Sequence, residues 1–347
     1  MWFYYVCFLC ILALRIGTRR TKLLRLLLIG VALLLIAGLR AETVDHDYLG
    51  YLEYYDNVLY AGFVNVEPTF IALAHAISST LDNPLILFLV YAALGTSLKL
   101  IGIAQLSRYP LASALIYFSG FFLLWEMTQI RAAVAGGLLL VSIRYIRERR
   151  AIPYFSLASL AALFHYGAII YLPLFFLRPD RIKPWVYYLL IPVATAIYMS
   201  GVSLIDFASF APIQLIELKI QSYETYVDAE DHIFNAVYLA RCALAFLLLA
   251  NQGLLRRQNA YFLLLIKIYF VALFVHVALA SIPGIASRLS ELMLVVEVIL
   301  IPMLAHLAKE RVVGHTAVVM VGLAFLTFSL YYTKLLMPYA ISPALIQ

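Results

Sequence analysis

Charged residues are scarce in this chain of 347 residues: they make up 13% of the sequence, about half the share of an average soluble domain. Hydrophobic residues supply 65% instead. This composition excludes a soluble enzyme, a disordered protein and a disulfide-stapled secreted domain. At ~20 apolar residues per crossing, the length allows roughly ten to twelve membrane helices. We therefore expect an all-α polytopic membrane protein that forms a single transmembrane domain over residues 1–347.

Cysteine and cofactor motifs are almost absent as well. The three cysteines, Cys7, Cys10 and Cys242, lie inside apolar runs, so the C-x-x-C spacing of the first two predicts lipid-facing helix rather than a redox or metal site. The sequence has no H-x-x-x-H, no dense carboxylate set at ligand spacing, no P-loop and no dinucleotide-binding glycine pattern. We expect no metal, no other cofactor and no use of ATP.

Long hydrophobic runs are plentiful, and they predict the helices. They span residues 2–14, 23–39, 66–80, 84–106, 110–126, 128–145, 153–177, 184–204, 233–251, 259–281, 288–307 and 312–333. Lysine and arginine concentrate in the short connections, which predicts that these face the cytoplasm. Acidic residues gather at about 41–66 and 205–232, which we interpret as extracytoplasmic loops. The net charge of +6 therefore reflects membrane topology rather than nucleic-acid binding.

The number of apolar runs between two connections must be odd when they lie on opposite faces of the membrane and even when they lie on the same face. Two stretches of the chain do not satisfy this rule. The first is repaired if residues 66–80 form a short helix at the outer interface that ends in an Asp82-Asn83-Pro84 turn. The second is repaired if the run 153–177 breaks near His165 into two half-length helices with the histidine at their outer tip. Non-helical backbone at membrane depth requires surrounding protein or water, so the break predicts a cavity. The alternative is that the positive-inside rule fails at one loop.

Arg131 is notable because an ionisable side chain at membrane depth is costly and therefore indicates function. It begins a helix rich in alanine and glycine, and small residues permit close helix approach. We expect it near the outer end of a tightly packed helix. A guanidinium group there can donate two hydrogen bonds to phosphate oxygens. The alternative is an interfacial arginine that reaches to lipid headgroups.

Further charged residues fall inside or beside the apolar runs. Arg288 begins a helix, with Glu291 one turn later on the same face, so it is either a ligand-binding residue or half of a helix-end ion pair. Arg241 lies ~12 Å into its helix at 1.5 Å per residue, which favours a functional role. Glu297 is similarly deep, and we expect it to pair with Lys267 on the preceding helix.

The outer segment interleaves acids with tyrosines. It runs from Asp45 through Tyr51 to Glu67, and it suits a sugar because aromatic faces stack on sugars while carboxylates accept hydrogen bonds from their hydroxyls. The alternative is an interfacial aromatic belt. Arg40 ends the second helix at the outer face and is more typical of an anchor than of a ligand. His165, at the expected break, is as consistent with function as with structure.

Five short motifs follow one another along the chain. They are Asp47-x-x-x-Tyr51, Glu67-Pro68-x-Phe70, Ile130-Arg131-x-x-x-Ala135, Phe164-His165-Tyr166 and Ser287-Arg288-Leu289. In this order and spacing they resemble the EpsG family, the Wzy-like polymerases of bacterial exopolysaccharide and O-antigen. The resemblance covers roughly residues 40–300, and residues 200–260 carry no matching motif.

The resemblance implies a membrane glycosyltransferase of the bacterial inner membrane. Such an enzyme transfers a growing glycan from undecaprenyl pyrophosphate onto a new lipid-linked repeat unit at the outer face, without a metal or a nucleotide sugar. A chain-length regulator would be a partner, besides the lipid-linked substrate and membrane lipid. The other classes that we retain are a transporter or flippase of lipid-linked sugars and an O-antigen ligase, which differs only in its acceptor.

This chemistry assigns candidate cations. Since the donor leaves as a pyrophosphate, developing negative charge needs preorganised cations in a site of low dielectric constant. Arg131 and Arg288 are the first candidates, for catalysis as well as for pyrophosphate binding, and Arg241 and Arg40 are the second. We expect Arg131 and Arg288 to meet in one wet pocket near the external leaflet.

The remaining roles are a base and the contacts to the sugar. An acceptor hydroxyl needs a base within hydrogen-bond reach, and His165 and Asp47 are the two candidates. His165 is slightly preferred because it lies at the expected helix break. The candidate sugar-binding residues are Asp45, Tyr51, Glu67 and Tyr166.

Overall fold

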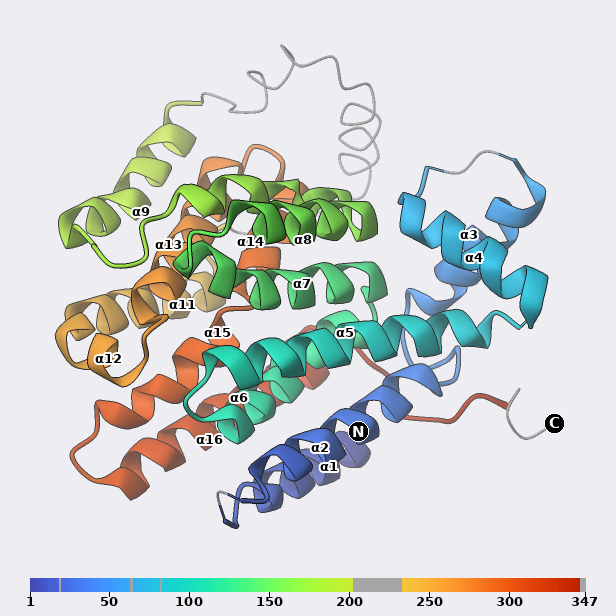
Figure 1. The fold of residues 1–347 in the computed structure, drawn as a ribbon, viewed down its shortest axis with the longest axis horizontal. Coiled ribbons are helices and arrows are strands. Elements are labelled where there is room, and N and C mark those ends of the chain that lie inside the picture. The colour runs from blue at the N-terminus through green and yellow to red at the C-terminus, as the bar shows by residue number, and fades with distance from the viewer. Residues whose placement is uncertain (19, 63–64, 82, 202–232, 344–347) are drawn as a thin grey trace. The chain divides into compact units, whose positions relative to one another are not determined.

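The computed structural model describes the whole chain except residues 19, 63–64, 82, 202–232 and 344–347 (Figure 1). The chain divides into two compact units. Unit 1 consists of Met1–Tyr145, Arg150–Ile169 and Val298–Gln347, and unit 2 consists of Ile146–Arg149 and Ile170–Glu297. A single transmembrane domain stays a prediction.

Unit 1 is built from helices at both ends of the chain. Its elements are α1 (Trp2–Leu14), α2 (Lys22–Gly38), α3 (Tyr48–Tyr60), α4 (Pro68–Thr80), α5 (Leu85–Leu106), α6 (Pro110–Tyr117), the π-helix η1 (Phe118–Glu126), most of α7 (Ile130–Arg147), α8 (Ala151–Phe164), most of α15 (Glu297–Leu300), the 3-10 helix η4 (Ile301–His306), α16 (Arg311–Thr327) and the π-helix η5 (Phe328–Tyr332). Helix α2 packs along α5, and α16 packs against η4, η1 and α6.

Unit 2 is built around a central buried helix. Its elements are most of the 3-10 helix η2 (Tyr166–Phe176), α9 (Pro184–Met199), α11 (Ala236–Ala250), α12 (Gln252–Gln258), α13 (Phe262–Ala278) and α14 (Pro283–Leu294). Helix α13 packs against α9, α11, α12 and α14, and most of its side chains are buried. An apolar helix surrounded in this way is a core element of its unit.

The hydrophobic runs predicted the helices well. Each run contains one to three helical elements, and the described residues hold no extended strand, only two isolated β-bridges. The predicted break is confirmed: α8 ends at Phe164, His165 has extended backbone angles of −154° and 112°, and η2 begins at Tyr166. The all-α fold class is therefore confirmed.

The two acidic segments differ in what can be said of them. The first is not wholly irregular, because α3 occupies its middle. The short helix predicted for residues 66–80 is present as α4, whereas the first residue of the turn expected after it, Asp82, lies outside the described part of the chain. The second acidic loop, 205–232, also lies outside it. The membrane face of both segments stays a prediction.

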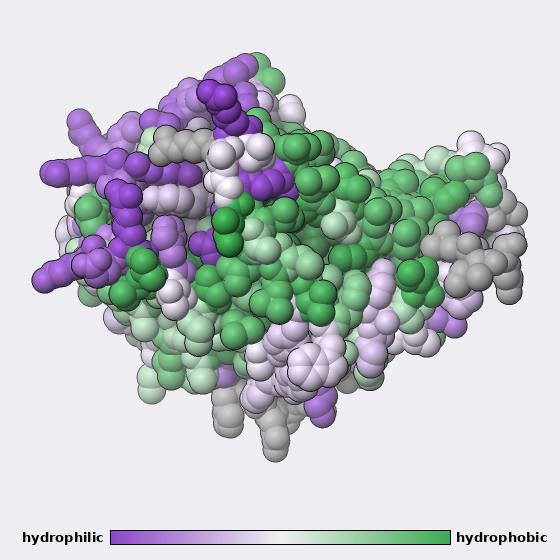
Figure 2. Space-filling model, turned by 90° about the horizontal axis from the view of Figure 1, so that it is seen from below, coloured by the Kyte–Doolittle hydropathy of each residue, from purple (hydrophilic) through white to green (hydrophobic). Residues whose placement is uncertain are grey.

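Length and composition support membrane insertion. Among the described helices, Leu85–Leu106 and Arg311–Tyr332 are long and apolar enough to cross a membrane, and two bent helix pairs raise that number to four. Several other apolar helices are shorter, so the expected ten to twelve crossings stay a prediction. The face of the molecule drawn in Figure 2 carries hydrophobic residues across its middle and right, beside a strongly hydrophilic patch at the upper left. On α2 alone, Leu23, Leu24 and Leu27 are more than half exposed, as expected for side chains that contact lipid.

Glycines bring α5 and α7 close together within unit 1. A Cβ atom at Gly102 would lie 2.5 Å from Cβ of Leu140, and one at Gly137 would lie 2.7 Å from Cβ of Leu98. Neither position can take a larger side chain unless the two helices separate. The small residues that follow Arg131 therefore serve the tight helix packing expected from the sequence.

Candidate functional site

A buried carboxylate, Glu67, is the centre of the candidate site in unit 1. Glu67 has extended backbone angles of −65° and 146°, and Pro68 follows as the first residue of α4, where its missing N–H costs no hydrogen bond. The Glu67 carbonyl accepts from the backbone N–H of Phe70 at 2.9 Å. Its side chain is fully buried, so the carboxylate needs partners within the protein.

Three motif residues supply those partners. Nη1 of Arg131, at the start of α7, donates to Oε2 of Glu67 in a close ion pair. Nδ1 of His165 lies 3.5 Å from Oε1 of Glu67, and the backbone N–H of Tyr166 donates to the same oxygen at 3.4 Å. Three residues from two other motifs therefore meet at the Glu67 carboxylate.

The helix break explains how His165 and Tyr166 reach Glu67. Thr69 Oγ1 donates to the carbonyl oxygen of Leu163 at 2.8 Å, which ties the first turn of α4 to the end of α8. The Tyr166 hydroxyl donates to the carbonyl of Val66 at 3.3 Å. Because the helical hydrogen-bond pattern stops at His165, its side chain and the next N–H can turn toward the carboxylate.

Tyrosines of α3 surround the arginine. The guanidinium carbon of Arg131 lies 5.6 Å from the ring centre of Tyr51 and 5.5 Å from that of Tyr54, both within cation–π range. Burial raises the pKa of the Tyr51 phenol, and the charge of Arg131 opposes that shift. The phenol therefore stays protonated at neutral pH and can donate a hydrogen bond.

The site is partly exposed to its surroundings at the arginine and the histidine. The side chains of Arg131 and His165 are 19% and 17% exposed, in contrast to the fully buried Glu67. Nε of Arg131 is buried without a hydrogen-bond partner among the described residues. A carboxylate that orients an imidazole beside a guanidinium group provides both a base and a site for negative charge.

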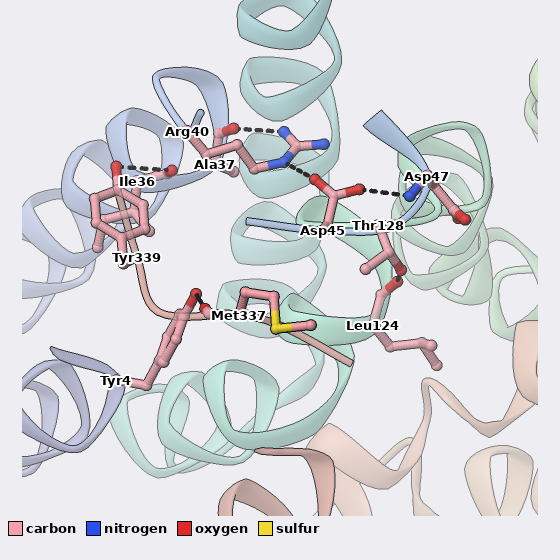
Figure 3. Close-up of polar contacts among 10 residues, drawn as sticks. All are labelled: Tyr4, Ile36, Ala37, Arg40, Asp45, Asp47, Leu124, Thr128, Met337 and Tyr339. Carbon is pink, nitrogen blue, oxygen red and sulfur yellow. Dashed lines mark hydrogen bonds and ion pairs between the residues drawn. The ribbon is translucent and has the colours of Figure 1, made fainter. Parts of the chain in front are cut away.

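Arg40 and Asp45 lie in a second cluster of unit 1, drawn in Figure 3. Nε of Arg40 donates to Oδ2 of Asp45 at 2.6 Å, Nη1 donates to the carbonyl of Ala37 at 2.6 Å, and the Asp47 N–H donates to the other Asp45 oxygen at 3.0 Å. Both side chains of the ion pair are fully buried. Neither presents exposed surface to a ligand, and the pair fixes the turn that leads into α3.

Asp47 differs from this pair in its exposure. It precedes α3, its side chain is exposed, and its carbonyl accepts from the Tyr51 N–H at 3.0 Å. Asp47 therefore lies one helical turn from the tyrosine that contacts Arg131. Its role as a base stays a prediction.

Unit 2 holds a separate group of the predicted cations. Nε of Arg241 donates to Oε1 of the fully buried Glu297 at 3.0 Å, and the Tyr269 hydroxyl donates to the same oxygen at 2.7 Å. Arg241 and Arg288 both act electrostatically on Glu291, so the two arginines belong to one charged group. Arg288 is exposed.

The predicted pair between Lys267 and Glu297 is wrong. The Lys267 ammonium group donates to the backbone carbonyls of Arg178 and Arg181, and Arg241 is the partner of Glu297. Depth along a helix does not fix the direction of a side chain, because the rotation of each helix decides which residues face each other. Since Arg131 and Arg288 belong to different units, their meeting in one pocket stays a prediction.

A further ion pair in unit 1, like Arg40–Asp45 fully buried on both sides, was missed from the sequence. Lys99 on α5 and Glu126 at the end of η1 contact each other, and both side chains are fully buried. The signal was present, since both residues fall inside apolar runs where charge is costly.

As for metals, no cluster of three or more His, Cys, Asp or Glu side chains suited to an ion occurs in the part of the chain that the structure describes.

Together these features define an all-α membrane protein with ion-paired arginines among apolar helices and a carboxylate–arginine–histidine cluster at a helix break. The model of the EpsG family matches residues 23–341, nearly the whole chain, and the chain belongs to that family. This is a family of Wzy-like polysaccharide polymerases. Comparisons with curated proteins and with solved structures give no match.

Proposed function

We propose that this protein is a membrane glycosyltransferase that polymerises oligosaccharide repeat units linked to undecaprenyl pyrophosphate, at the outer face of the bacterial inner membrane. The observation that carries the proposal is the convergence on Glu67. Tyr51, Arg131, His165 and Tyr166 come from three further motifs and reach this carboxylate or the arginine bound to it. Packing alone does not explain why a cation, an imidazole and a carboxylate lie together.

His165 takes the role of general base in this proposal. Its Nδ1 faces Glu67, so Nε2 is the nitrogen that accepts the proton from the acceptor hydroxyl. The hydroxyl oxygen then bonds to the anomeric carbon of the donor sugar, while the bond from that carbon to the pyrophosphate oxygen breaks. Glu67 orients the imidazole and stabilises the imidazolium ion that forms.

Arg131 acts on the leaving group. Its guanidinium group is paired with Glu67 and lies within cation–π range of two tyrosine rings, so its charge is preorganised before the bond breaks. Arg288 and Arg241 of unit 2 are proposed as further pyrophosphate contacts, and Asp47 as the alternative base. Tyr51 and Tyr166 supply aromatic faces and hydroxyl groups to the sugar.

Variants in cells test the proposal. Arg131→Ala and His165→Ala are expected to retain normal protein levels in the membrane while cells display only single repeat units. The matched controls are Arg257→Ala and His75→Ala, which remove the same side chains at exposed positions. They are expected to support long chains. Long chains of normal abundance from both site variants would defeat the proposal.

A further inference from the structure

Besides the contact between its two members, the Lys99–Glu126 pair makes one that connects it to the candidate site within unit 1. Nζ of Lys99 also donates to the backbone carbonyl oxygen of Ala133 at 2.6 Å. Ala133 lies two residues after Arg131 in the first turn of α7. The Lys99 ammonium group therefore joins α5, the end of η1 and the turn of α7 that carries the arginine.

Gly95 and two aromatic rings lie close around the pair. A Cβ atom at Gly95 would lie 3.0 Å from Oε1 of Glu126 and 3.1 Å from Cβ of Ala133, so glycine makes the space that the carboxylate occupies. The Lys99 ammonium group lies 4.9 Å from the ring centre of Trp125 and 5.6 Å from that of Tyr117. The pair is enclosed by aromatic rings and helix backbone, with no exposed surface on either side chain.

Stability alone does not account for such a pair. The cost of removing two charges from water commonly equals or exceeds their attraction, and well-packed apolar replacements of a buried pair are often neutral or stabilising. A pair of this kind can instead fix one arrangement of the groups around it. Here the group that it fixes is the start of α7, beside the connection that leads from η1 to Arg131.

We propose that Lys99 and Glu126 are positioning residues for Arg131. They hold the first turn of α7 against α5, so that the guanidinium group meets Glu67 and the two tyrosines of α3. This inference rests on the proposed function, because it gives the pair a role in the reaction assigned to Arg131. A displacement of about 1 Å at a catalytic group is enough to cost about a hundredfold in rate.

The test uses purified full-length protein in detergent, a lipid-linked repeat unit as substrate, and the initial rate of chain extension as readout. Lys99→Met with Glu126→Gln removes both charges together, which avoids an uncompensated buried ion. We expect the turnover number to fall about 10- to 100-fold with the Michaelis constant within about threefold of wild type and the thermal midpoint preserved. The matched control, Glu310→Gln with Arg311→Met, removes one exposed charge of each sign and is expected to be fully active.

Coupling to Arg131 separates positioning from general structural damage. In an Arg131→Lys background, neutralising the pair should lower the turnover number by less than about threefold more, because both changes act through the same cation. An equal loss in both backgrounds, or a neutralised pair with wild-type turnover, would overturn the inference. If the double variant does not fold, Glu126→Asp keeps both charges, shortens the carboxylate, and is judged by the same two criteria.

The outcome for Arg131→Ala distinguishes failure of the proposed function from failure of the positioning role. Normal polymerisation by Arg131→Ala defeats the proposed catalytic role of the arginine, and the positioning inference falls with it. An inactive Arg131→Ala together with a fully active neutralised Lys99–Glu126 pair overturns the positioning inference alone.

Discussion

Neutralising the Glu67–Arg131 pair one partner at a time, and then both together, separates the contribution of the pair to stability from its contribution to catalysis. Glu67→Gln leaves a largely buried guanidinium group without its carboxylate, and Arg131→Met leaves a fully buried carboxylate without its cation. Breaking a buried pair in this way costs about 3–5 kcal/mol. Because the Arg131 side chain is 19% exposed and retains some solvation, we expect about 3 kcal/mol, at the lower end of that range.

At about 2–4 °C per kcal/mol for a folding unit of this size, a loss of about 3 kcal/mol should lower the thermal midpoint of each single variant by about 6–12 °C. The double variant Glu67→Gln with Arg131→Met removes both charges and should recover most of that loss. It should nevertheless form no long glycans, because neither the cation nor the carboxylate that orients His165 is present. The assay is the loss of monodisperse protein on heating in detergent, beside chain extension on the same samples. A double variant that regains polymerisation along with its stability would refute the catalytic role of the pair.

Two further predictions concern the packing of unit 1. Arg40→Met or Asp45→Asn alone should destabilise the protein by about 4 kcal/mol, because each leaves a fully buried charge unpaired. The double variant should recover most of the lost thermal midpoint. Single variants as stable as wild type would contradict the structural role of the pair. Gly137→Ala should cost about 1–3 kcal/mol through overpacking of α5 against α7, measured as a lower midpoint, whereas Gly253→Ala, whose Cβ would meet nothing within 4 Å, should be neutral or slightly stabilising. Equal midpoints for the two glycine variants would contradict the close packing.

Much of the local structure could be predicted from hydrophobic runs and loop charge. The break at His165 is the clearest case, because it was inferred from the parity of crossings and is present in the backbone. The number of crossings required a break in this run, and the histidine–tyrosine–glycine stretch is a plausible place for it because none of its residues is a strong helix former.

Long-range pairing could not be predicted in the same way. Glu67 and Arg131 are 64 residues apart, and nothing in the sequence indicates how far α4 and α7 are rotated about their axes. For the same reason Glu297 pairs with Arg241 rather than with Lys267. The Lys99–Glu126 pair differs from these cases, because its two residues could have been identified from the sequence. Each places a charge inside an apolar run, where charge is costly.

The most direct test of the proposed site is the glycan length made by purified protein in detergent, where no bilayer remains to be crossed. Wild-type protein supplied with a single defined lipid-linked repeat unit should produce a ladder of longer glycans, and His165→Ala should leave the substrate at one unit. No extension by folded wild-type protein would favour a flippase or a ligase instead. A ladder of wild-type length from His165→Ala would contradict the role of this histidine as the base that Glu67 orients.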